Sequence, residues 1–159
     1  MSSQNITIEE VLMAQEEWRA GVINIGKKFI KEEDYLSYAE TFLDSLYAFD
    51  IGDVLFKPTL ASEIQFRLTK KGALSYFVGG NPDFSEDNGF ALMSWEDIRF
   101  ENQKIQIEGG IALTMGNYFM KKDGIETKVE YSLIYKKYPQ GYIRIILHDS
   151  HLPYIPNTF

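Results

Sequence analysis

Apolar residues recur every three or four positions in the first third of the chain, which is the spacing of an α-helix that packs one face on a core. One such stripe covers residues 11–29 and follows Thr7-Ile8-Glu9-Glu10, a sequence suited to a capping box. A second covers residues 35–47 and follows Asp34, a good N-cap residue, and we expect this helix to end near residues 50–52. The pattern predicts two long amphipathic helices at the start of the chain.

Beyond Asp53 the pattern changes to short runs in which apolar and polar residues alternate, separated by Gly, Pro and Asn. Such runs are typical of β-strands joined by turns. We expect strands at residues 54–59, 63–68, 90–93, 97–100, 104–107, 111–120, 129–137 and 142–148, a short helix at 70–78, and turns at 79–83, 121–124 and 139–141. Two helices followed by a long antiparallel meander predict an α+β fold in which one curved sheet wraps the helices.

The chain is long enough for one domain with a real core: it has 159 residues, of which 45% are hydrophobic, and we expect residues 1–159 to form a single domain. The aromatic share of 14% favours a lined cavity or extensive interfaces. Apolar residues occupy both faces of the strands expected at 111–120 and 142–148. A sheet that is apolar on both faces needs a partner on each, so we predict a homodimer formed through the sheet.

The net charge of −7 argues against nucleic acid and anionic membrane surfaces as partners, because both bind clustered Lys and Arg. The chain has no Cys, which excludes disulfides and thiolate chemistry. No apolar run is long enough to span a membrane, and the first five residues do not resemble a signal peptide. We therefore expect a cytoplasmic protein without a membrane segment.

The last predicted strand carries both histidines of the chain. Because side chains alternate along a strand, His148 and Ser150 should share one face, and Asp149 and His151 the other. An imidazole and a hydroxyl on one face are a candidate for proton transfer, although a histidine that only hydrogen-bonds at a strand end explains the pattern equally well. Arg144 has the parity of His148, where it would attract an anion or, more simply, form a salt bridge.

Five local sequences stand out when taken in order. They are Val54-Leu55-Phe56-Lys57-Pro58-Thr59, Gly72-Ala73-Leu74-Ser75-Tyr76-Phe77-Val78-Gly79-Gly80, Phe100-Glu101-Asn102, Met115-Gly116-Asn117-Tyr118-Phe119 and Leu147-His148-x-Ser150-x-Leu152-Pro153-Tyr154. Together they resemble the iota-class carbonic anhydrases, and the resemblance runs from about Trp18 to the C-terminus. The resemblance implies a cone-shaped, nuclear-transport-factor-like fold, shared with the association domain of calcium/calmodulin-dependent protein kinase.

The resemblance also implies a site and an activity. Metal-free members of this family interconvert carbon dioxide and bicarbonate at the base of the cone without a cofactor. The matching positions here are Thr59, Tyr76, His148 and Ser150. The family usually reads His-His-Ser-Ser, whereas this chain reads His148-Asp149-Ser150-His151. By strand parity both substituted positions face away from the expected pocket.

The residues themselves set limits on the chemistry. Two histidines three positions apart on opposite strand faces, without Cys, do not make a zinc site, although a metal held with the help of carboxylates stays open. Without a metal, deprotonation of water by an imidazole of pKa roughly 6.5 is uphill by about 9 units, or ~12 kcal/mol. Proton removal must then accompany attack on carbon. His148 acts either as the base or as an orienting group, and a base of ordinary pKa would lose activity at about pH 6–7.

Other interpretations use the same residues. Tyr76 is equally well explained as a core aromatic residue, and Thr59 as the end of a strand. A non-catalytic module that binds a small ligand or assembles oligomers is the main alternative, because fold does not imply function. An acid–base isomerase or cyclase acting on a hydrophobic substrate is a third. Its chemistry requires a carboxylate facing a phenol such as Tyr76, and no acidic residue is obviously placed inward.

Overall fold

The computed structural model describes residues 4–157, so the first three residues of the N-terminus, where we expect no signal peptide, lie outside it. The helices are α1 (Ile8–Ile30), α2 (Tyr35–Leu46) and α3 (Lys70–Val78), with two 3₁₀ turns, η1 (Pro82–Phe84) and η2 (Phe90–Met93). The strands are β1 (Leu55–Lys57), β2 (Asp97–Glu108), β3 (Ile111–Lys122), β4 (Ile125–Lys137) and β5 (Ile143–His151). None of the helices in this part of the chain has the length and apolar character needed to cross a membrane.

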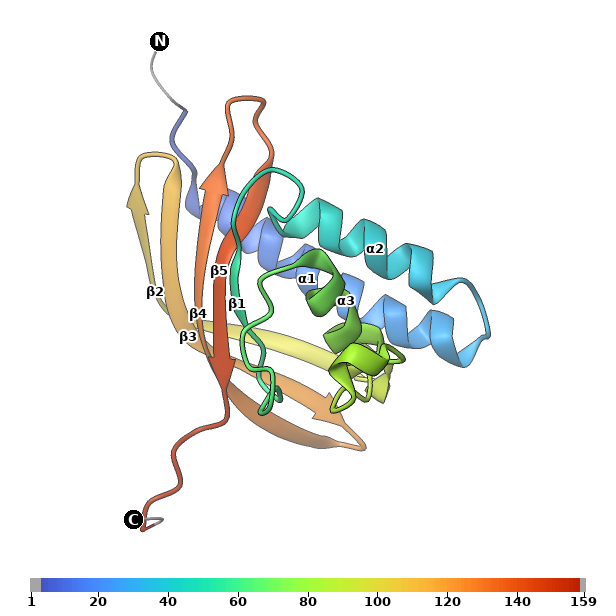
Figure 1. Cartoon of the computed structure of the whole chain (residues 1–159). Coiled ribbons are helices and arrows are strands. Elements are labelled where there is room, and N and C mark those ends of the chain that lie inside the picture. Colours follow the sequence, from blue (N-terminus) through green and yellow to red (C-terminus); the bar gives the residue numbers. More distant parts are fainter. Residues whose placement is uncertain (1–3, 158–159) are drawn as a thin grey trace.

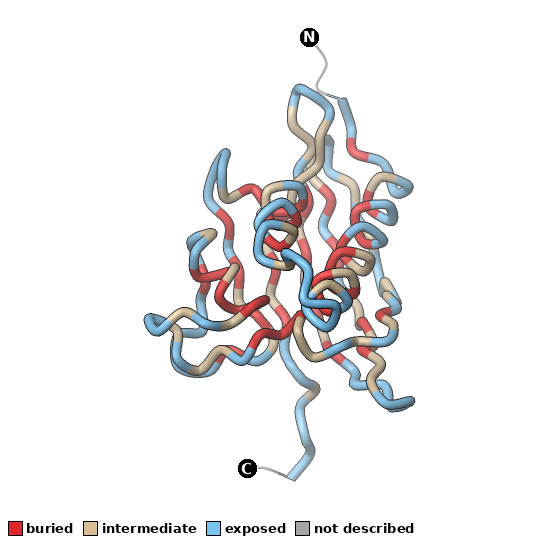
Figure 2. The backbone as a smooth tube through the Cα atoms, turned by 90° about the vertical axis from the view of Figure 1, so that its right-hand side faces the viewer, coloured by how far each residue is buried: buried red, intermediate tan, exposed pale blue. Residues whose placement is uncertain are grey.

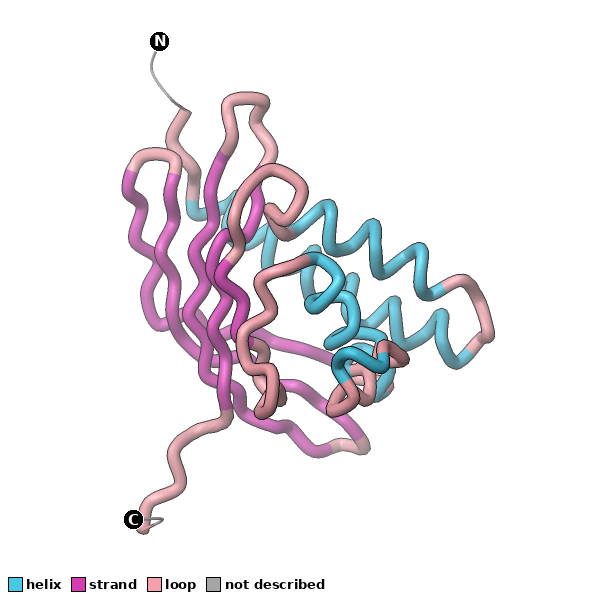
Figure 3. Tube along the Cα trace, viewed as in Figure 1, coloured by secondary structure: helices cyan, strands magenta, loops and turns pink. Residues whose placement is uncertain are grey.

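All five strands form one sheet in the order β1-β5-β4-β3-β2. Only β1 runs parallel to its neighbour, β5, and the other pairs are antiparallel. The sheet is strongly curved and the helices lie inside its curve (Figures 1 and 3). The buried residues lie mainly between the helices and the sheet, and the exposed residues lie mainly at the turns and on the outside (Figure 2). The predicted α+β fold with a mainly antiparallel curved sheet is confirmed.

The two long helices begin where the sequence predicts. The Thr7 hydroxyl accepts a hydrogen bond from the Glu10 N–H at 3.1 Å, and the Asp34 carboxylate accepts one from the Ser37 N–H at 3.1 Å. Helix α2 ends at Leu46, before the predicted residues 50–52. It ends there because Tyr47 is extended and bridges to Ile145, and the Ala48 N–H donates to the Ile145 carbonyl at 3.1 Å. Pairing with the sheet thus replaces the next helical turn.

The predicted strand at residues 63–68 is wrong: this segment is an irregular loop. The Arg67 N–H donates to the Phe56 carbonyl of β1 at 2.7 Å, but the start of the segment bonds a side chain instead of a strand. The carboxylate of Glu86 accepts hydrogen bonds from the N–H groups of Ser62, Glu63 and Ile64 at 2.7–3.2 Å. These bonds lower the pKa of Glu86 to about 2, with the Ser62 N–H making the largest contribution. Phe66 lies 63% exposed, so the alternation in the sequence does not reflect a buried face.

The predicted strand at residues 90–93 is also wrong, because these residues form η2. Gly89 and Ser94 flank it with φ angles of 83° and 63°, left-handed values that a strand does not allow. A short apolar run fits a buried turn as well as a strand, and periodicity does not separate the two. Here Phe90 packs on the ring of Tyr76, with the ring centres 5.3 Å apart.

The two strands expected at 97–100 and 104–107 are a single strand, β2, interrupted by a bulge between Asn102 and Lys104. Gly116 of β3 lies opposite this bulge. A Cβ atom at position 116 would lie 2.2 Å from the Glu101 carbonyl oxygen. The close approach of the two backbones therefore requires glycine at this position.

A second bulge changes which side chains of β5 face the core. Ile134 pairs with Leu147, but the next residue, Tyr135, pairs with Ile145, so β5 has one extra residue at this point. Ile145 and His148 are both buried although they lie three positions apart. Arg144 is therefore out of phase with His148, and the expected shared face is wrong. The Arg144 guanidinium lies 4.6 Å over the ring of Tyr142.

Candidate functional site

The four residues that the sequence singles out, Thr59, Tyr76, His148 and Ser150, line one narrow pocket inside the curve of the sheet. These side chains are closely packed and leave no space for a water-sized molecule between them. The remaining walls are aromatic or apolar, and Trp18 and Phe56 contribute two of them. The pocket therefore combines a few hydroxyl groups and one imidazole with apolar walls, which is the composition of a small-ligand site.

Strand pairing places Thr59 beside Ser150. Phe56 of β1 pairs with His148 of β5, so the chain leaving β1 passes next to the end of β5. The hydroxyl oxygens of Thr59 and Ser150 are 2.8 Å apart, and either one can donate the hydrogen bond. His148 and Ser150 are only 2% and 1% exposed. The Asp149 side chain is 49% exposed and that of His151 50%, which confirms the predicted alternation.

Tyr76 enters the pocket from α3. Its hydroxyl oxygen accepts a hydrogen bond from the Leu60 N–H at 3.3 Å. Burial raises the pKa of the Tyr76 phenol well above its ordinary value, while contacts with the Leu60 N–H and the Thr59 hydroxyl act in the opposite direction. Tyr76 therefore keeps its proton, and its hydroxyl lies beside Thr59 as a neutral donor.

His148 is enclosed by rings. The Phe56 ring stacks on it at 5.1 Å and the Trp18 ring meets it edge-on at 5.9 Å. Its Nδ1 lies 2.8 Å from the Tyr47 hydroxyl, and its Nε2 lies 3.3 Å from the Tyr118 hydroxyl. Burial lowers the pKa of the imidazole to about 3. The imidazole of His148 therefore does not titrate at about pH 6–7, as an ordinary imidazole does. It is neutral at physiological pH.

The sequence interpretation missed three residues of the site: Trp18, Tyr47 and Tyr118. Tyr118 lies in one of the segments that carry the family resemblance, so its position was a usable signal. Burial raises the pKa of its phenol to about 12, and contacts with the hydroxyls of Ser150 and Thr59 act against that rise. The sequence pattern predicts that Tyr47 lies within the second helix, but α2 ends at Leu46. Only the fold brings Tyr47 to His148.

Phe100-Glu101-Asn102, another of the resembling segments, has a supporting role behind the pocket. Asn102 and Gln15 exchange two side-chain hydrogen bonds of 2.8 Å, and the Tyr131 hydroxyl donates to the same Asn102 oxygen. Phe100 packs edge-on against Trp18 at 5.9 Å. These contacts tie α1 to the sheet and hold the wall that Trp18 provides.

The lining of the pocket contains no Asp or Glu. Within residues 4–157, no three side chains among the His, Asp and Glu residues come close enough together to hold a metal ion. The Lys57 ammonium donates to the Ser150 carbonyl at 3.1 Å and so supports the strand end. An isomerase mechanism that needs a carboxylate base facing Tyr76 lacks that base here.

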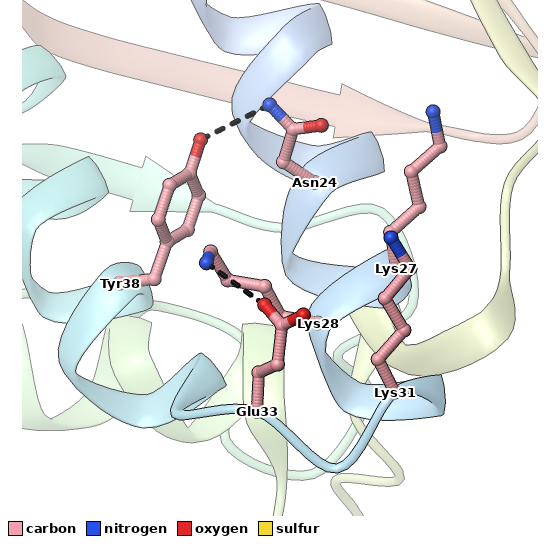
Figure 4. A pocket seen from close by; sticks show the side chains of 6 residues that line it. All are labelled: Asn24, Lys27, Lys28, Lys31, Glu33 and Tyr38. Atoms are coloured by element: carbon pink, nitrogen blue, oxygen red, sulfur yellow. Dashed lines mark hydrogen bonds and ion pairs between the residues drawn. The ribbon is translucent and has the colours of Figure 1, made fainter.

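Wider depressions lie on the surface. One, of about 290 Å³, is bordered by Lys27, Lys28 and Lys31 at the end of α1 (Figure 4). Lys28 pairs with Glu33 at 3.2 Å. Lysines in the last turn of a helix are stabilised by the helix dipole. That effect accounts for these lysines, and no feature of the depression indicates chemistry.

Comparison with known proteins agrees with this arrangement. Residues 9–152 match the family model described as metal-independent carbonic anhydrase. A metal-independent carbonic anhydrase of Nostoc sp. strain PCC 7120 is 42% identical over 153 residues, covering 94% of this chain and 75% of the relative.

Solved structures are similar as well. The crystal structure of an iota-carbonic anhydrase from a cyanobacterium, complexed with bicarbonate, superposes with a TM-score of 0.92 at 40% identity, covering 98% of this chain and 97% of the other. A putative dehydratase of the NTF2-like family from Streptomyces avermitilis has a TM-score of 0.56 at 14% identity, covering 93% and 96%. The second similarity is one of fold alone.

Proposed function

Because this chain belongs to the family of metal-independent carbonic anhydrases, we propose that it interconverts carbon dioxide and bicarbonate in the pocket lined by Thr59, Tyr76, His148 and Ser150. The observation that carries the proposal is the Thr59–Ser150 hydroxyl pair, 2.8 Å apart within apolar walls. The similar cyanobacterial structure is a complex with bicarbonate, which supports the same ligand here.

The apolar walls suit the substrate, carbon dioxide, and the hydroxyls suit the negative charge that develops as bicarbonate forms. Carbon dioxide is apolar and is compatible with a pocket walled by rings such as Phe56 and Phe90. As a water oxygen bonds to carbon, one C=O bond opens and negative charge develops on its oxygen. Hydroxyl donors in an apolar surrounding stabilise such charge more strongly than water does. The donors are Tyr76 and whichever hydroxyl of the Thr59–Ser150 pair does not donate to the other.

The attacking water must also lose a proton. His148 has a pKa of about 3 and Tyr118 one of about 12, so neither takes up or gives away a proton at neutral pH. The hydroxyl pair provides another path. One hydroxyl oxygen accepts the water proton while the pair passes its own proton to an oxygen of carbon dioxide. The atoms then balance as carbonic acid, which ionises to bicarbonate in bulk water after release.

A direct test is the initial rate of carbon dioxide hydration, followed by stopped flow with a pH indicator and a strong chelator present. The proposal expects hydration above the buffer background. Ser150→Ala, measured at equal folded concentration, should lose most of that rate. A wild-type protein with no hydration activity would refute the proposal and favour the non-catalytic binding or oligomerisation module.

We also propose a homodimer formed through the outer face of the sheet. Leu55, Leu147, Ile134 and Leu113 pair in one row across four strands, on the face opposite His148 and its partner Leu133. Leu55 is 57% exposed and Leu113 is 38% exposed. An apolar row of this kind favours a covering partner, and a second copy offers the same row in return. Sedimentation that shows a monomer at micromolar concentration would contradict the dimer.

Two further expectations remain predictions: that residues 1–159 form a single domain, and that the protein is cytoplasmic. Limited proteolysis and cell fractionation would test them.

A further inference from the structure

Four buried rings are joined by hydrogen bonds in a line that ends at the pocket. The Trp18 indole N–H donates to the Tyr47 oxygen at 3.0 Å. The Tyr47 hydroxyl lies 2.8 Å from His148 Nδ1, and His148 Nε2 lies 3.3 Å from the Tyr118 hydroxyl. Tyr118 lines the same pocket as Thr59 and Ser150, so the line ends beside the hydroxyl pair. All four rings are no more than 3% exposed, so water does not compete for these bonds.

The direction of the line follows from its first member. An indole nitrogen is a donor only, so the Tyr47 oxygen must accept from Trp18. The remaining partner of the Tyr47 hydroxyl is His148 Nδ1, and a buried hydroxyl proton is nearly always donated. Nδ1 is therefore the acceptor. A neutral imidazole carries one N–H, so the proton is on Nε2, and it points at the Tyr118 oxygen.

We propose that Trp18 and Tyr47 hold His148 in the Nε2–H tautomer, which makes it a donor to Tyr118 and a positioning residue of the site rather than its general base. This proposal rests on the proposed function for its effect on rate. Tyr118, having received a hydrogen bond, donates its own proton to the Thr59–Ser150 pair. One proton of the pair makes the bond between the two hydroxyls, and the other is then free to point at the substrate.

The same line cannot carry a proton away from the pocket. A proton from the pocket would reach His148 at Nε2, which already carries one. Nδ1 could pass no proton to Tyr47, because that hydroxyl already points its own proton at Nδ1 and its other partner, Trp18, is only a donor. With the opposite tautomer, Tyr118 would donate to His148 instead and would leave the hydroxyl pair without its donor. The role of the histidine is thus to fix the direction of the hydroxyl chain, and the product proton leaves with the product.

The tautomer is measured without reference to activity. Two-bond ¹⁵N–¹H correlation spectra of the imidazoles distinguish Nε2–H from Nδ1–H, and His151→Gln leaves His148 as the only histidine to assign. The proposal expects the Nε2–H form at neutral pH. A spectrum showing the proton on Nδ1 overturns it, whatever the hydration assay gives. Hydration activity missing from a protein with the Nε2–H form would sink the proposed function, together with the catalytic effect of the tautomer.

The effect on rate is tested with Tyr47→Phe, which removes the donor to Nδ1 and keeps the ring. We expect a mixed tautomer spectrum and a fall in kcat of about 10–100-fold, the size of a positioning defect. Tyr135→Phe is the matched control, because Tyr135 is equally buried and makes none of the hydrogen bonds of the line. It should leave the His148 spectrum and the rate unchanged. A Tyr47→Phe protein with wild-type spectrum and rate would overturn the proposal, and if this variant does not fold the wild-type spectrum still decides the tautomer.

Discussion

The neutral state of buried His148 predicts a loss of stability in mild acid. The perturbation is a change from pH 7.5 to pH 5. The native imidazole has a pKa of about 3, because burial disfavours its charged form. In the unfolded chain the same imidazole has a pKa of roughly 6.5. Between these two values the unfolded state binds a proton that the native state does not.

The sign and the size follow from proton linkage. Because the native pKa is lowered, stability is complete above about pH 6.5 and falls as the pH drops toward 3. The pH value of 5 lies about 1.5 units below the unfolded pKa, and each unit is worth ~1.4 kcal/mol, so the free energy of unfolding should fall by about 2 kcal/mol. Carboxylates such as Glu86, with a pKa of about 2, stay ionised in this window and contribute little.

Urea denaturation followed by tryptophan fluorescence at both pH values measures the difference. His148→Gln removes the titrating group, so its unfolding free energy should change with pH by about 2 kcal/mol less than that of the wild type. His151→Gln is the control, because it removes the other histidine, whose side chain is half exposed on the outer face. If His148→Gln and wild type lose the same stability between pH 7.5 and 5, the neutral buried imidazole is wrong.

Three other changes test the site. Ser150→Ala should lower the hydration rate by about 10²–10³-fold, the usual loss of one transition-state donor. The same substitution should lower the free energy of unfolding by less than about 1.5 kcal/mol. If the variant unfolds while the hydration rate per folded molecule stays unchanged, Ser150 has only a structural role. Asp149→His, which restores the usual family residue, should leave the rate within a few-fold, because this side chain is 49% exposed on the outer face; a collapse of the rate would place it in the mechanism. Purified protein should hold no stoichiometric zinc by elemental analysis, and activity lost on dialysis against a chelator and restored by metal would contradict a metal-independent reaction.

The sequence alone determined what depends on neighbouring residues. The starts of α1 and α2 are set by Thr7 and Asp34, whose side chains bond backbone groups three residues away. The alternation that separates His148 and Ser150 from Asp149 is a local property of a strand, and it held because the bulge of β5 lies before His148. The family resemblance supplied the four residues that line the pocket.

Tertiary structure decided everything that needs a distant partner. The segment 63–68 does not begin as a strand because Glu86, more than twenty residues away, accepts hydrogen bonds from the N–H groups of Glu63 and Ile64. Arg144 does not share a face of the sheet with His148, contrary to the sequence prediction, because the bulge adds one residue to β5 between them.

The chemistry of His148 shows the same division. Its presence and its face were readable from the strand. Its pKa depends on its burial in the core. Its two hydrogen-bond partners, which set the direction of its proton, are Tyr47, 101 residues away, and Tyr118, 30 residues away. An imidazole becomes a base or a donor according to the dielectric and the partners around it, and both are properties of the packed core rather than of the local sequence.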